Sequence, residues 1–131
     1  MQEQSVKGTP PPAGVLMDVD TSDGSIQLDD FGNGLAGVRL PSMDVPTATY
    51  KSGNVADPSL PGFLQGLGNL ACFLAGSVTP FDESTLHMLY PSDSKYESQV
   101  VQAVKSLKSQ GLLLQSDAVK IKELAQEGIP D

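Results

Sequence analysis

Apolar residues recur every three or four positions in the last third of the chain, the spacing of one face of an α-helix. Gly111 follows the stripe and is suited to end a helix in the left-handed conformation. Ser92, Asp93 and Ser94 are alternative N-caps, and Ser94 has capping-box spacing to Glu97. The pattern predicts a helix between these caps and Gly111, with its apolar stripe made of Tyr96, Val100, Ala103, Val104 and Leu107.

A second helical pattern follows after a short connection. Ser116 and Asp117 offer an N-terminus, and Gly128 with Pro130 offers an end. Because the connection is so short, the two helices are predicted to lie side by side as an αα-hairpin. The second stripe consists of Ala118, Ile121, Leu124 and Ala125.

A third, shorter helix is predicted just upstream of this pair. Asp82 is a favourable N-cap, and the helix is expected to run to about Leu89. Pro91 then stops it, because the residue before a proline avoids the helical region.

The pattern before residue 80 is weaker. Apolar segments at 15–19 and 25–28 flank Asp23-Gly24, a pair typical of a β-hairpin turn. Residues 45–50 are expected to form a short extended segment, which Pro46 would restrict to a sheet edge. The remaining glycine-rich stretches are expected to be irregular, and such backbone must find hydrogen-bond partners elsewhere.

These patterns predict an α+β fold with a loop-rich N-terminal part, a small β-hairpin, a short helix and a C-terminal αα-hairpin. Gly and Pro set the boundary, because only Gly111, Gly128 and Pro130 follow Ser92. We therefore expect one partial domain over 1–131, loop-rich over 1–91 and a helical hairpin over 92–131.

Composition narrows the possible partners. The chain has 131 residues, 39% of them hydrophobic, and a net charge of −8, which disfavours binding to nucleic acid and to anionic membrane surfaces. Its N-terminus lacks the apolar run of a signal peptide, and no stretch approaches 18 apolar residues. The sequence thus predicts no export signal and no membrane span, and leaves the compartment open.

The candidates for catalysis are few. The chain has no Gly-x-Ser-x-Gly motif, one histidine (His87) and one cysteine (Cys72), with Ser77 and Cys72 the nucleophiles nearest to His87 in sequence. His87 is better interpreted as a helix-surface or interface residue than as a base, and Cys72 as a small buried hydrophobe. We therefore predict no catalytic residue in this chain.

Candidates for ligand binding are equally sparse. One His and one Cys cannot build a zinc site, and the acidic run 18–24 departs from the EF-hand pattern, which favours a solvated turn over a calcium loop. Arg39, the only arginine, either pins a loop to a carboxylate or contacts a substrate or partner. Arg39 is thus the one binding candidate, and no metal or cofactor is expected.

Several segments, taken in order, resemble the C-terminal part of the alpha/beta hydrolase domain family, a group of serine esterases. The resemblance extends from about residue 5 to 128. Its segments are VKGTPPP (6–12), GNGLAGVRLP (32–41), DVPTATY (44–50), AGSVTPF (75–81), LYPS (89–92) and GLLL (111–114), the last between the two helices.

The resemblance implies a hydrolase several times longer than this chain, with its nucleophile elbow and catalytic histidine upstream of the matching region. No catalytic residue can therefore be carried over. We interpret the chain as the C-terminal piece of such a hydrolase, from a truncated or split gene and inactive alone. Two alternatives are a binding module that complements a separate catalytic chain and a small enzyme that uses His87.

Residues 60–81 are mostly apolar, are interrupted only by Gly, Pro and small polar residues, and carry no charge. Such a run is normally buried, yet the two helices offer only narrow stripes to cover it. We expect it to pack on a hydrolase body or to mediate self-association.

Overall fold

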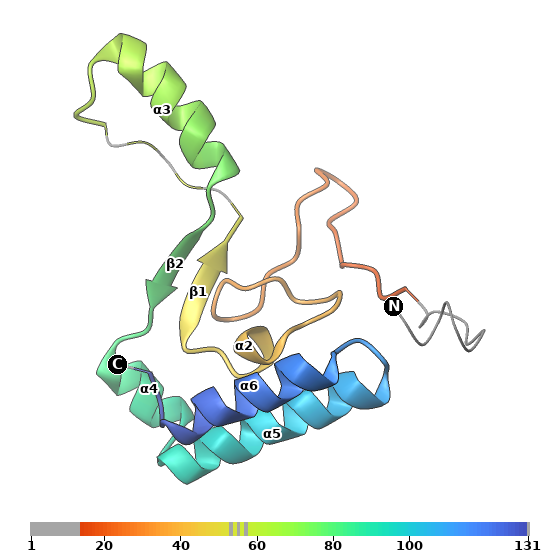
Figure 1. Ribbon diagram of the computed structural model, residues 1–131. Coiled ribbons are helices and arrows are strands. Elements are labelled where there is room, and N and C mark those ends of the chain that lie inside the picture. The colour runs from red at the N-terminus through yellow and green to blue at the C-terminus, as the bar shows by residue number, and fades with distance from the viewer. Residues whose placement is uncertain (1–13, 53, 55, 57, 131) are drawn as a thin grey trace.

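The computed structural model describes residues 14–130 except 53, 55 and 57, and it leaves the side chains of Phe63 and Phe73 undescribed. The VKGTPPP segment of the resemblance lies outside the described residues. The described helices together with an antiparallel strand pair confirm the α+β prediction (Figure 1). In chain order the elements are α2 (Pro41–Asp44), β1 (Ala48–Lys51), α3 (Gly62–Leu74), β2 (Ser77–Pro80), α4 (Glu83–Leu89), α5 (Asp93–Ser109) and α6 (Gln115–Gln126).

The predicted helical hairpin is confirmed by α5 and α6, which lie side by side (Figure 1). Of the three possible caps, Ser92 caps α5, and its hydroxyl accepts a hydrogen bond from the Lys95 N–H at 3.3 Å. Gly111 has a φ of 72° and ends the helix as predicted. The expected N-cap of α6 was wrong, because Leu114 is the N-cap, without a side-chain hydrogen bond, and Ser116 lies inside the first turn. The end of α6 was as predicted, since Gly128, with a φ of 104°, directly follows the C-cap Glu127.

The core forms where this hairpin meets α2, α4 and the chain before β1. Val104 is fully buried at its centre, and Tyr90 is buried beside it, with its hydroxyl donating to the Pro46 carbonyl at 2.8 Å. Tyr90 follows the end of α4. The start of this helix is as predicted, because the Asp82 side chain accepts a hydrogen bond from the Thr85 N–H at 2.8 Å. The buried members of the core are Val45, Leu86, Tyr90, Val100, Ala103, Val104, Ala118 and Ala125.

The sheet is a pair of antiparallel strands in which Ala48 lies opposite Pro80 and Lys51 opposite Ser77. The expected strand at 45–50 is thus confirmed in its second half, whereas its partner β2 was not predicted. The expected hairpin at 15–28 forms its turn but not its strands, with a single bridge between Val19 and Ile26. Its apolar side chains are exposed, so no core stabilises longer strands there.

The largest departure from the prediction is α3, a 13-residue helix in a segment expected to be irregular. Leu, Ala and Cys supply helix-compatible side chains, and three glycines lower helix propensity without preventing the helix. The helix lies away from α5 and α6, beyond the end of the strand pair at which β1 finishes and β2 begins (Figure 1). None of the helices in the described part of the chain is long and apolar enough to cross a membrane.

Candidate functional site

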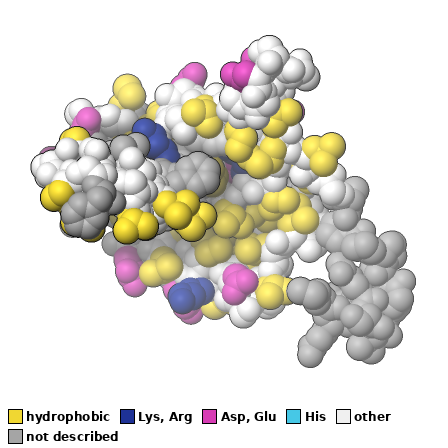
Figure 2. Space-filling model, turned by 90° about the horizontal axis from the view of Figure 1, so that it is seen from above, with side chains coloured by type: hydrophobic (Ala, Val, Ile, Leu, Met, Phe, Trp, Pro, Cys, Tyr) yellow, Lys and Arg dark blue, Asp and Glu magenta, His cyan; other side chains and the backbone are white. Residues whose placement is uncertain are grey.

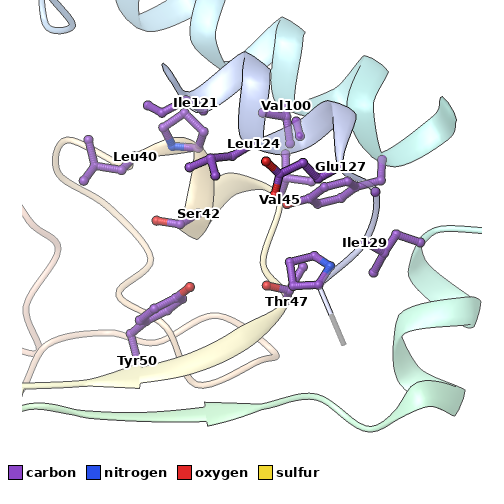
Figure 3. Close-up of a pocket in the computed structure, with 15 residues that line it drawn as sticks. Leu40, Ser42, Val45, Thr47, Tyr50, Val100, Ile121, Leu124, Glu127 and Ile129 are labelled. Carbon is purple, nitrogen blue, oxygen red and sulfur yellow. The ribbon is translucent and has the colours of Figure 1, made fainter. Parts of the chain in front are cut away.

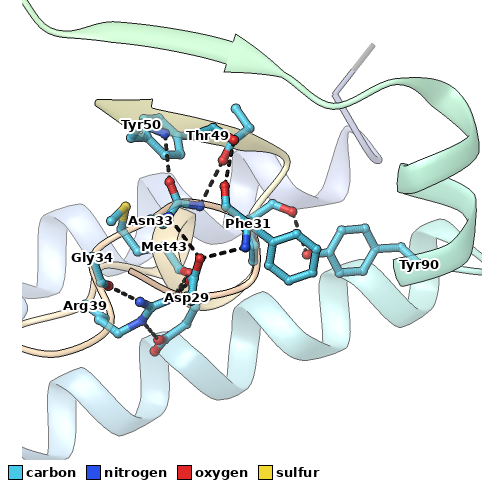
Figure 4. Close-up of polar contacts among 12 residues, drawn as sticks. Asp29, Phe31, Asn33, Gly34, Arg39, Met43, Thr49, Tyr50 and Tyr90 are labelled. Atoms are coloured by element: carbon cyan, nitrogen blue, oxygen red, sulfur yellow. Dashed lines mark hydrogen bonds and ion pairs between the residues drawn. The ribbon is translucent and has the colours of Figure 1, made fainter. Parts of the chain in front are cut away.

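The binding candidate Arg39 lies in a network that joins the loop before it to α2 (Figure 4). Its Nε donates to Asp44 Oδ1 at 2.9 Å and its Nη2 to Asp29 Oδ2 at 2.8 Å. It also donates to the carbonyls of Gly34 and Met43. A guanidinium has five N–H donors, so four of them have partners inside the chain. That Arg39 contacts a substrate or partner stays a prediction. Such a contact would use the one remaining N–H of a side chain that is 19% exposed.

Asp29 is the acceptor that organises the loop before Arg39. Its Oδ1 accepts from the backbone N–H groups of Phe31 at 3.0 Å and Asn33 at 2.9 Å. Burial alone would raise the pKa of Asp29, but hydrogen bonds from Arg39 and from these two N–H groups outweigh it and lower the pKa below its usual value. The carboxylate therefore stays ionised and holds the loop in one conformation.

Asn33 then fastens this loop to β1. It is fully buried, its side-chain amide donates to the Ala48 carbonyl at 3.1 Å, and its side-chain oxygen accepts from the Tyr50 N–H at 2.7 Å (Figure 4). Thr49 adds a hydrogen bond from its hydroxyl to the Phe31 carbonyl at 2.7 Å. The loop thus takes the place of a third strand along the edge of β1.

The residues considered for catalysis come from three different elements: Cys72 from α3, Ser77 from β2 and His87 from α4. His87 is exposed, and its Nε2 lies 3.5 Å from Glu83 Oε1, one helical turn earlier. Both residues line a cavity of about 440 Å³ beside α4. Cys72 is half-buried rather than buried, because it belongs to the outlying helix α3.

The acidic run at 18–24 forms a turn that uses its own carboxylates. Asp20 Oδ1 accepts from the Ser22 N–H at 2.7 Å, and Asp23 Oδ1 from the Ser25 N–H at 2.8 Å. The hydrogen bonds from Ser22 lower the pKa of Asp20. Among the described residues, no group of three or more His, Cys, Asp or Glu is placed to hold a metal ion.

A larger cleft, of about 720 Å³, lies between α2 and β1 on one side and α5 and α6 on the other (Figure 3). Sequence reasoning missed it, because its walls come from three distant segments, 40–50, 96–100 and 121–130. Its apolar lining includes Leu40, Val45, Val100, Ile121, Leu124 and Ile129, and its polar lining consists of Ser42, Thr47, Tyr50, Tyr96 and Glu127.

The surface of α3 is the second notable feature. Leu67, Leu70 and Leu74 are 66%, 62% and 77% exposed, and Val78 on β2 is exposed as well. Hydrophobic side chains of other parts of the chain also gather in the middle of the molecule seen from above, whereas acidic ones lie mostly toward its margin (Figure 2). The segment 60–81, which the sequence shows to be apolar and uncharged, is therefore largely uncovered in its described part.

Comparison with known proteins places the chain in a family. The model of the alpha/beta hydrolase domain family matches residues 1–123, which includes the segments that carry the resemblance up to GLLL. No curated protein and no solved structure matches the chain. Because the match extends over most of the sequence, this chain belongs to the alpha/beta hydrolase domain family.

Proposed function

We propose that this chain is the C-terminal segment of an esterase-type alpha/beta hydrolase, that it is inactive alone, and that it packs on the hydrolase body that holds the nucleophile. The observation that carries the proposal is the exposed, uncharged surface of α3 and β2. Family membership supports the nature of the partner.

The energy of this surface supports packing on another body. Burial of apolar surface is worth roughly 25 cal/mol per Å², so covering about 400 Å² contributes on the order of 10 kcal/mol. That exceeds the stability of many single domains. Because this surface carries no charged side chain, packing on a partner incurs no free-energy cost for desolvating a charge on it.

The arrangement of the histidine supports inactivity. His87 is highly exposed, and Glu83, whose Oε1 lies 3.5 Å from its Nε2, is on the same helix face. An esterase needs a histidine within hydrogen-bond reach of a nucleophile held on a sharp turn, with donors for the oxyanion. The sequence supplies no such elbow.

The alternative is a stand-alone binding module that complements a separate catalytic chain. The closed core around Val104 favours it, because α5, α6, α4 and α2 bury one another without help from α3. In this alternative the same surface of α3 is a reversible interface.

The activity half of the proposal is tested with purified chain and p-nitrophenyl acetate. We expect no rate above the background of an unrelated protein such as albumin. A saturable rate that is lost in Ser77→Ala or His87→Ala, but kept in the exposed control Ser109→Ala, would overturn the proposal and favour the enzyme that uses His87.

The packing half is tested with a longer family hydrolase from which the matching C-terminal region has been deleted. We expect the purified chain to bind this deleted hydrolase and restore its esterase activity. The variant Leu67→Lys/Leu70→Lys should bind at least tenfold more weakly, whereas Val119→Lys on α6 should bind like the original. Failure of the unaltered chain to bind would contradict the proposal.

A further inference from the structure

We infer that the cleft between α2–β1 and α5–α6 is a binding site for a neutral, mainly hydrocarbon molecule with one hydroxyl or ester group. Its residues are described above and shown in Figure 3. This inference rests on the cleft alone and does not depend on the proposed hydrolase segment.

The size and lining of the cleft fit a small organic ligand. A volume of about 720 Å³ lies within the range of small-molecule sites, which are mostly apolar with a few placed polar groups. Aliphatic side chains of α5 and α6 form one wall, among them Val100 and Ile121. Such a wall binds hydrocarbon by removing it from water.

The polar groups of the cleft are hydroxyls. Figure 3 shows Tyr50 reaching from β1 toward the cleft, with Ser42 above it on α2. Within the described part of the chain, neither of these two hydroxyls has a hydrogen-bond partner. Hydroxyls donate and accept, so they suit an alcohol or an ester carbonyl. Burial raises the pKa of Tyr96 nearby, with a smaller contribution from Tyr50, which agrees with a poorly hydrated lining.

The charge of the lining selects against anions. Among the described residues that line the cleft, Glu127 is charged and none is Lys, Arg or His. The whole chain carries a net charge of −8, which adds to the repulsion of a carboxylate ligand. A neutral ligand avoids this repulsion.

The wall near Glu127 is held in place. The Asp93 carboxylate accepts from the Ile129 N–H at 3.1 Å, which ties the end of α6 back to the start of α5. Gly128 has a φ of 104°, and a Cβ there would meet Asp93 Oδ1 at 3.2 Å. This hydrogen bond and close contact fix the backbone that carries Glu127 and Ile129 on this side of the cleft.

The test is a titration of the ¹⁵N-labelled chain with 1-octanol and, separately, with octanoate at pH 7, followed by amide chemical shifts. We expect saturable shifts for Val45, Tyr50, Val100 and Ile121 with 1-octanol, and at least about threefold weaker binding of octanoate, the size of a modest charge repulsion. Glu127→Gln removes the negative charge on the cleft and should therefore reduce the difference in affinity between 1-octanol and octanoate.

Two variants separate the cleft from the exposed surface of α3. Ser42 is exposed, so Ser42→Trp should fill the mouth of the cleft and weaken 1-octanol binding at least tenfold without unfolding the chain. Gln102 is also exposed, on α5 and outside the cleft, so Gln102→Trp should bind like the original. Shifts confined to α3, equal binding of octanoate and 1-octanol, or unchanged binding by Ser42→Trp would each overturn the inference.

Discussion

Two helices of similar length, α3 and α5, have opposite relations to the rest of the molecule. The amphipathic helix α5 carries five charged residues and buries Val100, Ala103, Val104 and Leu107. The helix α3 carries no charge and consists mostly of apolar residues and glycine, yet its leucines are exposed. The more apolar helix is thus the less buried one.

The difference lies in the partners that each helix finds. The stripe of α5 faces α6 and α2, whose own apolar residues complete the core. The contacts of α3 are with the short loop before it: the Asn54 N–H donates to the Cys72 carbonyl at 2.9 Å, and the Ala56 N–H to Asn69 Oδ1 at 3.2 Å. An apolar surface therefore marks a need for burial, and the available partner decides whether burial occurs.

The largest expected effect comes from placing a charge in the stripe of α5. Val104 is fully buried, so Val104→Asp buries a carboxylate without a partner or opens the core, and should cost about 3 kcal/mol or more. We expect a thermal melt to show a midpoint at least about 10 °C lower, or no folded state. The exposed control Lys105→Gln should change stability by less than about 0.5 kcal/mol. Equal midpoints for Val104→Asp and the original would show that the stripe is not buried.

A smaller effect is expected from the side chain that fastens the loop to β1. Asn33→Ala leaves the Ala48 carbonyl and the Tyr50 N–H without their partners in a buried site, and should cost about 2 kcal/mol in urea unfolding. Asn69→Ala is the matched change near α3, where the exposed Asn69 holds the Ala56 N–H, and should cost less than about 1 kcal/mol. Equal losses of stability in the two variants would mean that the loop at β1 is held no more firmly than the outlying helix α3.

The third prediction uses pH. Burial raises the pKa of Tyr90 from 10.0 to about 12, with a smaller contribution from Tyr96. Between these values the unfolded chain loses a proton that the folded chain keeps, so the contribution of Tyr90 to the free energy of unfolding should be constant below pH 10 and fall as the pH rises toward 12. Tyr90→Phe should cost about 1 kcal/mol at pH 7, for the lost bond to Pro46, and should fall less steeply above pH 10. Parallel curves for the two chains would place Tyr90 in a hydrated site.

The core helices α4 and α5 were more predictable than α3. Helical spacing, Asp82 as a cap and Gly111 as a stop are local signals, and each of them is confirmed. The strand β2 and its register with β1 were not predictable, because the pairing joins distant parts of the sequence, such as Ala48 and Pro80. The helix α3 was not predicted, because the spacing of its leucines is the only helical signal in this segment. Its glycines and the lack of a side-chain cap argue against a helix.

The candidate sites also differ in how far the sequence predicts them. Arg39 was correctly singled out as a residue able to join a loop to carboxylates, since one guanidinium in an acidic chain has many possible acceptors. Which carboxylates it meets, Asp29 and Asp44, depends on how the loop folds. The cleft was not predictable, because no motif marks it and its walls meet only in the folded chain.

The smallest effect on stability, and the sharpest test of the comparison, is expected from α3 itself. Because Leu67 and Leu70 are already largely exposed, Leu67→Lys/Leu70→Lys removes little buried surface and should change the free energy of unfolding by less than about 0.5 kcal/mol. The same change should abolish the self-association and the binding of the dye ANS that we expect of the original chain at micromolar concentration, measured by sedimentation equilibrium and fluorescence. Val119→Lys places a charge at an apolar position on α6 that is also exposed, at 44%, and should leave both properties unchanged. An original chain that is monomeric and binds no dye, or a double variant that loses several kcal/mol, would show instead that α3 is covered in solution, and the contrast between the two helices would disappear.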